Sequence, residues 1–274
     1  MASAPEKSKL DFSKERGELD EAQQKLEKLN LEEEAKRSHE AQEKEKALKG
    51  VDDSKRDFSK ELEQAMKRLK NAAGHRKEDK WVSEGEISPA IEVYSEPTPA
   101  GRKSVCGTGL IEASPARVLA EIINPASWKE WDPLLKSSKV KKLDDTKRLV
   151  YLEINSVWPY NERDLVYLEI TGKEEDGSMY AATCGVSSAD FPITDSYVRA
   201  LLVSGGWYLK AVKDNPNQCV ATYFMDMDPL LAWMPQWLMN MAATRFPGII
   251  NKVRDGIAIK DGKKKKEEGW FGLW

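Results

Sequence analysis

Cysteine and histidine are scarce in this chain, which has three cysteines and two histidines among 274 residues. Cys106, Cys184 and Cys219 lie far apart and form no CxxC pair. Their odd number and wide spacing argue against a disulfide framework and against a structural zinc site. His39 and His75 both lie in the polar N-terminal part, outside any apolar pocket that the sequence predicts. We therefore expect neither a metal nor a cofactor.

The sequence motifs of common catalytic sites are missing as well. There is no GxSxG nucleophile elbow, no glycine-rich phosphate loop and no HExxH metal motif. Glu153 or Tyr167 could act as an acid or a base in an apolar pocket, but nothing in their spacing favours that role. We expect a protein that is not an enzyme, with a cyclase-like enzyme as the lesser alternative.

The chain also has no long uninterrupted apolar run. Its first residues, MASAPEKSKLDF, lack the apolar stretch of a signal peptide. The longest apolar run, 229–250, is broken by prolines and polar residues and is too polar to span a membrane. Lys and Arg number 43 against 46 Asp and Glu, so the net charge gives no support for nucleic-acid binding. We expect a cytoplasmic protein with peripheral membrane contact only.

Aromatic residues are nearly absent from the first 80 positions, whereas all nine tryptophans lie from Trp81 onward. A segment with so little apolar bulk cannot offset the entropy of its own ordering, but the remainder can fill a core. The sequence therefore predicts a charged helical extension at 1–54, one folded domain at 55–260 and a separate tail at 261–274.

Residues 17–49 predict a helix, because they are rich in Glu, Lys, Gln, Ala and Leu and contain no Pro. Four positions from Leu19 to Leu29 follow the spacing of a coiled-coil seam, and the pattern then fails at Glu33 and Lys36. Self-association through 17–49 and a solvated single helix both remain open.

The rest of the chain predicts a mixed α+β domain. Helices are expected at 55–71, at 115–123 and from about 234 to the end of the domain. Strands are expected at 91–94, 104–110, 140–143, 149–155, 164–172, 179–185, 198–208 and 219–227, most of them separated by turn residues. A curved antiparallel sheet wrapped around the long C-terminal helix is the natural packing of these elements.

Several short motifs then occur in a recognisable order. Trp131-Asp132 follows the short helix, Arg163-Asp164 opens a later strand, and a P-x-W-x-x-N motif from Pro235 to Asn240 opens the last helix. This series resembles the START (StAR-related lipid transfer) family, and is most similar to its branch of phosphatidylcholine-transfer-like proteins. The resemblance implies a helix-grip fold whose apolar tunnel holds one lipid, and implies lipid binding and transfer between membranes. A lipid-sensing scaffold with a coiled-coil N-terminus is the alternative function.

The resemblance also implies ligand-binding positions. Lys129 matches the basic residue that meets a lipid phosphate in choline-selective members. The positions that form their aromatic cage fall at Leu152, Leu165 and Val203, all aliphatic, which predicts that a choline head group is not preferred.

Two arginines and two residues of the last helix complete the candidate lipid site. Arg163 could anchor a head group, or could act with Asp164 to fasten the start of a strand to the adjacent helix. Arg199 lies in an apolar run, so a buried ion pair and a ligand contact are both open. Trp237 and Met241 are expected either to pack in the core or to line the tunnel beneath a helical lid.

The tail combines lysines with aromatic residues, a pattern typical of an interfacial membrane contact. The expected membrane-contact residues are Trp233, Lys263, Lys264, Lys265, Lys266, Trp270, Phe271 and Trp274. Two other interpretations remain open. Residues 267–273 resemble an acidic W-x-x-L motif that autophagy adaptors bind, and the tail tryptophans could instead pack against the domain.

Overall fold

The computed structural model of this protein describes residues 51–74, 81–87, 90–98, 103–156, 161–228 and 236–264. Six single residues between 25 and 43 are described too, and all are helical and exposed. For 236–245 the description covers the backbone alone. The rest of the predicted helix at 17–49, and the tail from Lys265 onward, lie outside the described residues.

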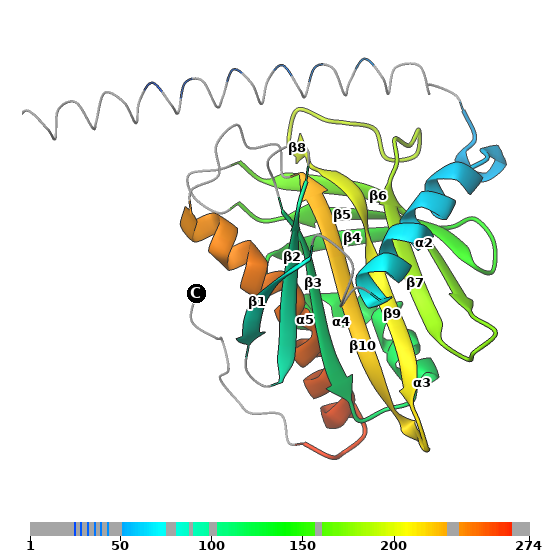
Figure 1. The fold of residues 1–274 in the computed structure, drawn as a ribbon. Helices are drawn as coiled ribbons and strands as arrows, with labels where there is room; N and C mark the ends of the chain where they lie inside the picture. Colours follow the sequence, from blue (N-terminus) through cyan, green and yellow to red (C-terminus); the bar gives the residue numbers. More distant parts are fainter. Residues whose placement is uncertain are drawn as a thin grey trace, which may run out of the picture.

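One sheet of ten strands dominates the structure, with β1 and β4 at its two edges (Figure 1). Its strands are β1 (Val82–Ile87), β2 (Ile91–Pro97), β3 (Lys103–Ile111), β4 (Leu135–Lys142), β5 (Lys147–Ile154), β6 (Arg163–Lys173), β7 (Met179–Gly185), β8 (Val198–Arg199), β9 (Leu201–Val212) and β10 (Asn215–Asp228). The spatial order is β1-β2-β3-β10-β9-β7-β6-β5-β4, and every neighbouring pair on this path is antiparallel. The short strand β8 pairs with β6 in parallel.

Helix α2 (Ser59–Gly74) covers one face of the sheet, which we call the outer face (Figure 1). The Asp57 carboxylate accepts a hydrogen bond from the backbone N–H of Ser59 at 2.9 Å and so caps the first turn. Buried residues then recur at three- and four-residue spacing: Leu62, Ala65, Leu69 and Ala72. This apolar stripe packs on β7, β9 and β10. A short 3-10 turn, η1 (Asp53–Lys55), precedes α2.

Three helices lie on the opposite face, which we call the inner face: α3 (Pro115–Ile122), α4 (Pro125–Trp131) and α5 (Gln236–Lys260). Ser114 and Asn124 cap α3 and α4, and each cap is followed by a proline at the first helical position. The main core lies between these helices and the sheet, and includes Trp128, Trp131 and Trp207. None of the helices in the described ranges is long and apolar enough to cross a membrane.

Two glycines of β3 bring α5 close to the inner face. A Cβ on Gly107 would lie 2.5 Å from the Cβ of Pro247, and a Cβ on Gly109 would lie 3.3 Å from Ile250. A side chain at Gly107 would therefore push the helix away from the strand. The close contact between α5 and β3 therefore depends on glycine at these two positions of β3. Helix α5 continues through Pro247 as one helix.

The predicted fold class is confirmed, since a large antiparallel sheet packs on a long C-terminal helix. Three details of the prediction were wrong. Strand β1 was missed because its sequence, VSEGEI, is short of β-favouring residues and contains a bulge at Gly85. Helix α4 was missed because it has only seven residues. The run predicted as one strand at 198–208 is broken at Ala200 into β8 and β9.

Candidate functional site

An apolar surface lies on the inner face near the end of the sheet that carries β8. Leu165, Ala200 and Leu202 are buried there. Around them pack side chains that are only partly buried: Leu152, Ile154, Tyr167, Met225 and Met227. We call these eight residues the inner apolar wall. They come from β5, β6, β9, β10 and the link between β8 and β9.

A partly buried ion pair lies farther along the same face. Arg148 and Glu169 are register partners on β5 and β6, and Arg148 Nε donates a hydrogen bond to Glu169 Oε1 at 2.7 Å. Arg148 Nη1 donates to the backbone carbonyl of Ile123 at 2.6 Å. Its guanidinium carbon lies 5.3 Å from the ring centroid of Trp128. Nη2 is buried and has no acceptor among the described residues, so one donor of this guanidinium is left over.

The electrostatics of the ion pair follow from its burial. Burial raises the pKa of the Glu169 carboxyl, and the charge of Arg148 offsets part of that rise. Burial also raises the pKa of Tyr167 well above its usual value, with a further contribution from the negative charge of Glu169. Tyr167 thus stays a neutral phenol beside the ion pair. It is surrounded by protein and nevertheless keeps some accessible surface.

The two predicted arginines have different surroundings. Arg199 is buried and forms a bidentate ion pair with Asp164, at 2.7 Å from Nε and 2.9 Å from Nη2. Arg199 Nη2 also donates to the carbonyls of Phe191 and Pro192. Arg163 shares the inner-face side of β6 with Leu165, is 9% exposed, and donates to the carbonyl of Asn161. Asp164 therefore pairs with Arg199 of β8, and not with a helix as the fastening interpretation of Arg163-Asp164 expected.

The remaining predicted positions lie both inside and outside the inner apolar wall. Leu152 and Leu165 belong to it. Val203 lies beside a bulge between β9 and β10 and is 43% exposed, whereas its neighbour Leu202 packs in the wall. Lys129 is exposed on α4, next to the buried Trp128.

Other predicted residues have little or no side-chain description. Trp237 and Met241 lie in the first two turns of α5, where only the backbone is described. Lys263 and Lys264 lie just beyond the end of α5 and are exposed. The other expected membrane-contact residues are outside the described residues: Trp233, Lys265, Lys266, Trp270, Phe271 and Trp274.

The two residues that the catalytic alternative names, Glu153 and Tyr167, are not brought together by the sheet. Glu153 and Tyr167 lie on opposite faces of the sheet, because Glu153 is paired with Asp164 and Tyr167 with Val150 along the same two strands. Hydrogen bonding from Ser137 lowers the pKa of Glu153, which keeps that carboxyl ionised. Within the described ranges, no three His, Cys, Asp or Glu side chains gather as metal ligands would.

Sequence reasoning missed Arg148 and Glu169. A signal existed, since Arg148 precedes Val150 and Leu152 at two-residue steps, and Glu169 follows Leu165 and Tyr167 in the same way. A charged residue that lies two positions from an apolar residue of the same strand faces the same side of the sheet as that residue. Two such charges of opposite sign on neighbouring strands indicate a buried pair.

Comparison with known proteins agrees with this architecture. The model of the START domain family matches residues 61–246. Human STARD10 is 16% identical, with a TM-score of 0.61 over 80% of this chain and 87% of that chain. The human StAR-related lipid transfer protein 5 is 18% identical, with a TM-score of 0.57 over 71% of this chain and 98% of that chain.

A bacterial structure has the same fold. The fragment of a STAR-related lipid transfer protein from Xanthomonas axonopodis is 23% identical, with a TM-score of 0.56 over 65% of this chain and 99% of that one. No curated protein sequence matches the chain. The likeness to the phosphatidylcholine-transfer branch stays a prediction.

Proposed function

This chain belongs to the START domain family, and on that premise we propose that it holds one lipid between the inner face of its sheet and α5 and carries it between membranes. The lipid's apolar part would lie along the inner apolar wall, and its polar end would reach Arg148. The proposal includes the three-part organisation into an extension at 1–54, the domain at 55–260 and a tail at 261–274. It also includes a cytoplasmic location and transient membrane contact.

The observation that carries this proposal is the incomplete burial of apolar side chains on the inner face. Leu152, Ile154, Met225 and Met227 are partly buried although they lie on the inner face of the sheet, the face that also carries α5. A finished protein core buries such side chains completely. Covering them with an acyl chain or a ring system would gain about 25 cal/mol for each Å² of apolar surface removed from water. Accessible apolar surface on an inward face therefore supports an apolar ligand.

The leftover donor of Arg148 supports a polar contact at the end of this surface. A buried donor without an acceptor costs about 1–3 kcal/mol, and a ligand oxygen at Nη2 would recover that cost. Nη2 can only donate, so the group that it binds must be an acceptor, such as a hydroxyl, a carbonyl or a phosphate oxygen. We propose that Arg148, oriented by Glu169, positions the lipid's polar end.

Residues of α5 would close the site from the other side. Trp237 and Met241, with the backbone of the first two turns of α5, are proposed to line the lipid-binding space. The contributions of Lys129, Arg163, Arg199 and Val203 to lipid binding also remain proposals. The structure gives Arg199 a firm alternative role in the ion pair with Asp164.

Native mass spectrometry of the full chain from a eukaryotic host, followed by lipid extraction, tests this proposal first. We expect one lipid per chain, and transfer of that lipid between vesicles. A protein that stays empty after incubation with mixed liposomes would contradict lipid binding. A protein that binds lipid and does not transfer it would instead be the lipid sensor, the alternative function.

Arg148→Met tests the polar contact, with Lys173→Met as the matched control. Both changes remove one positive charge, but Arg148 is partly buried on the inner face and Lys173 is exposed at the end of β6. Losing a charged hydrogen bond of about 1.5–3 kcal/mol should weaken lipid binding roughly tenfold to a hundredfold in Arg148→Met. Equal affinity in the two variants would remove Arg148 from the site.

A further inference from the structure

A shallow hollow of about 260 Å³ opens on the outer face of β1, β2, β3 and β10, apart from the lipid site. Its lining includes Glu86, Glu92, Thr108, Leu110 and Val220. Leu110 and Val220 are register partners on β3 and β10, and they are 40% and 39% exposed. The hollow therefore offers adjacent uncovered apolar side chains beside acidic ones.

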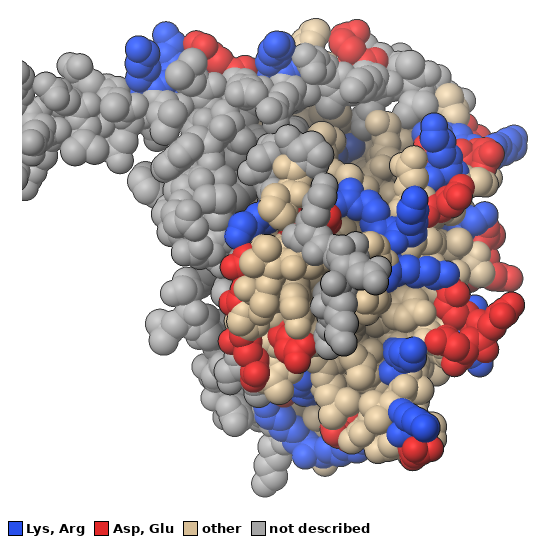
Figure 2. All heavy atoms as spheres, in the orientation of Figure 1, with Lys and Arg blue, Asp and Glu red and all other residues tan. Residues whose placement is uncertain are grey.

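The acidic part of the hollow is arranged to accept a cation. Glu86 and Glu92 are register partners on β1 and β2, so two carboxylates face each other directly across the strands. Glu92 also accepts a hydrogen bond from the Tyr94 hydroxyl at 3.1 Å, and two carboxylates in this position together attract a positive group. Figure 2 shows acidic side chains gathered over β1 and β2 on this face, and basic side chains along the lower edge where α5 ends.

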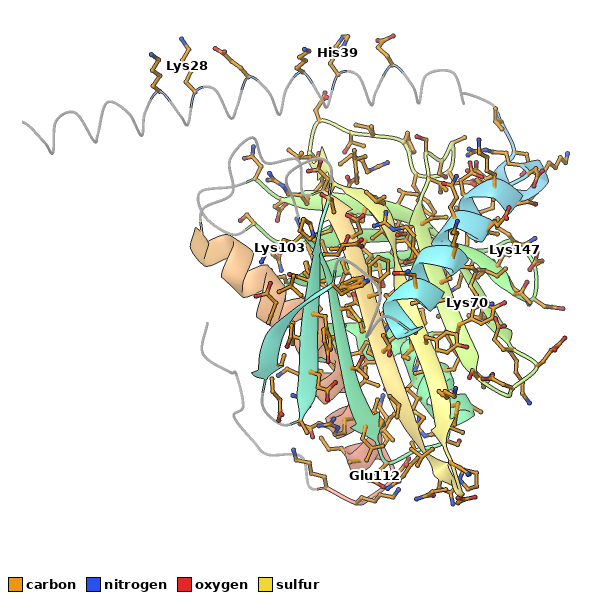
Figure 3. All side chains as sticks on the ribbon, viewed as in Figure 1. Lys28, His39, Lys70, Lys103, Glu112 and Lys147 are labelled. Carbon is orange, nitrogen blue, oxygen red and sulfur yellow. The ribbon has the colours of Figure 1, made fainter. Side chains whose placement is uncertain are left out.

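The chain leaves α5 next to this hollow. Gly262, with a φ of 71°, ends the helix, and the backbone N–H of Lys263 bonds to the Ala258 carbonyl at 2.8 Å. Lys263 Nζ then donates to the carbonyl of Glu112 at 3.4 Å. Figure 3 places Glu112 at the foot of α5. Glu112 follows Leu110 by two residues, about 7 Å along an extended strand.

We propose that the C-terminal tail, residues 265–274, docks in this hollow of its own domain. Lys265 and Lys266 would meet Glu86 and Glu92, and the tail's aromatic residues would cover Leu110 and Val220. The tail is long enough to cross the hollow. Ten extended residues span up to roughly 33–36 Å, and the strands from β10 to β1 extend over only about 14 Å. Lys263 already reaches the strand side through Glu112, whereas Lys264 pairs back to Asp255 of α5 at 3.0 Å.

Docking would regulate membrane contact, a consequence that rests on the function proposed above. Lysines held by Glu86 and Glu92 are not available to anionic lipid head groups, and aromatic residues on Leu110 and Val220 are not available to the bilayer interface. An anionic membrane would therefore have to compete with the hollow for the tail. The carrier would expose its membrane-binding segment only where such a membrane is present.

A paramagnetic label on Gly272→Cys of the full chain tests the contact with neither vesicles nor added lipid present. The native cysteines are buried, so the label reacts at the new position. We expect loss of the methyl NMR signals of Leu110 and Val220 and an intact signal from Val140 of β4, at the opposite edge of the sheet. Intact signals from Leu110 and Val220 would overturn the proposal, whether or not the protein transfers lipid.

Charge variants and vesicles complete the test. Glu86→Gln with Glu92→Gln should restore the Leu110 and Val220 signals, whereas Glu63→Gln with Glu175→Gln removes two exposed carboxylates elsewhere and should not. Undiminished contact in the first double variant would overturn the proposal, because charge assigns the tail to this hollow. Anionic vesicles should also restore the signals. Vesicle binding by a tail that never contacts Leu110 or Val220 would leave it a membrane anchor only, and the proposal would be wrong.

Discussion

The outer face beneath α2 and the inner apolar wall differ in how completely their apolar side chains are packed. On the outer face, Leu149 and Leu168 are fully buried beneath α2 with Cys184. On the inner face, Leu152 and Met225 keep accessible surface. The packing beneath α2 is therefore complete, whereas the inner apolar wall keeps accessible surface that a ligand could cover.

The charged groups of the two faces differ in how many hydrogen bonds they form. The bidentate pair of Asp164 with Arg199 extends from the outer side of β6 to the loop at 186–197, with Arg199 also bonded to two carbonyls of that loop. Arg148 Nη2 on the inner face has no acceptor among the described residues. The hydrogen bonds of Arg199 hold it in the scaffold, whereas we propose a ligand as the acceptor for Arg148 Nη2. Changes on the outer face should thus alter stability, and changes on the inner face should alter binding.

The largest effect is expected from Arg199→Met. The change leaves the Asp164 carboxylate buried without its partner, which should lower the free energy of unfolding by about 3–5 kcal/mol. Urea titration measures this loss. Adding Asp164→Leu should recover most of it, because an apolar pair no longer buries a lone charge. Lys136→Met, which breaks an exposed pair with Glu162, serves as the control and should leave stability nearly unchanged. Full stability in Arg199→Met would contradict the scaffold role of the outer face.

A pH-dependent effect is expected on the inner face. Burial holds the pKa of Glu169 above its usual 4.5, so the folded state binds a proton more readily than the unfolded state. Stability should therefore fall as pH rises above 4.5 toward the folded pKa. In Arg148→Met the pKa of Glu169 rises further, and the fall should extend to higher pH with a slope of up to ~1.4 kcal/mol per pH unit. Urea titrations at pH 5 and pH 8 measure this slope, and parallel curves for wild type and variant would contradict it.

A third effect concerns the join between η1 and the loop at 186–197. Asp53 accepts hydrogen bonds from Ser188 Oγ at 2.6 Å and from Arg56 Nη1 at 2.7 Å. Asp53→Ala removes both and should cost about 2 kcal/mol. Burial opposes ionisation of Asp53, but the hydrogen bonds from Ser188 and Arg56 outweigh it and hold its pKa below 3.8.

The lowered pKa of Asp53 also predicts how stability depends on pH. Asp53 stabilises the fold above pH 3.8, and its contribution is lost as pH falls through the lowered pKa. The difference in stability between wild type and Asp53→Ala should therefore narrow on acidification. Asp145→Ala, at an exposed turn position, is the control and should change stability little. A constant difference across acidic pH would show that the Asp53 carboxylate does not join the two segments.

The sequence predicted the fold better than the site, for a physical reason. Runs of β-favouring residues and a long apolar helix fix which elements form, and few packings of such elements exist. Strand β1 was not predicted because a bulged edge strand with Ser, Glu and Gly lacks a run of β-favouring residues. The break at Ala200 was not predicted because β8 and β9 pair with different strands. The local sequence does not determine which strand each segment pairs with.

The site depends on which charged residues meet across strands. The sequence alone left Arg199 open between an ion pair and a ligand contact, and the ion pair is what the structure shows. It directed attention to Lys129, which is exposed, and did not single out Arg148, which is partly buried and bonded to the buried Glu169. Strand register determines which charged residues become partners, since the residue opposite a given position depends on the pairing of the whole sheet.

The smallest effect compares two thiols, one on each face. Cys184 packs on the outer face and Cys219 in the inner-face core, and burial raises the pKa of both to about 12. Because the thiolate is the reactive form and the two pKa values match, a difference in alkylation rate reports a difference in how often each face opens.

Cys219 should react faster than Cys184 in lipid-free protein, because α5 and the inner face are proposed to separate when lipid enters. A gap of ~1.4 kcal/mol in opening free energy would make this difference about tenfold. Bound lipid should slow Cys219 and leave Cys184 unchanged, and mass spectrometry of alkylated peptides measures both rates. Equal rates with and without lipid would mean that the inner face opens no more readily than the outer face. The uncovered apolar side chains of the inner apolar wall would then belong to a rigid surface, and lipid would need another route into the protein.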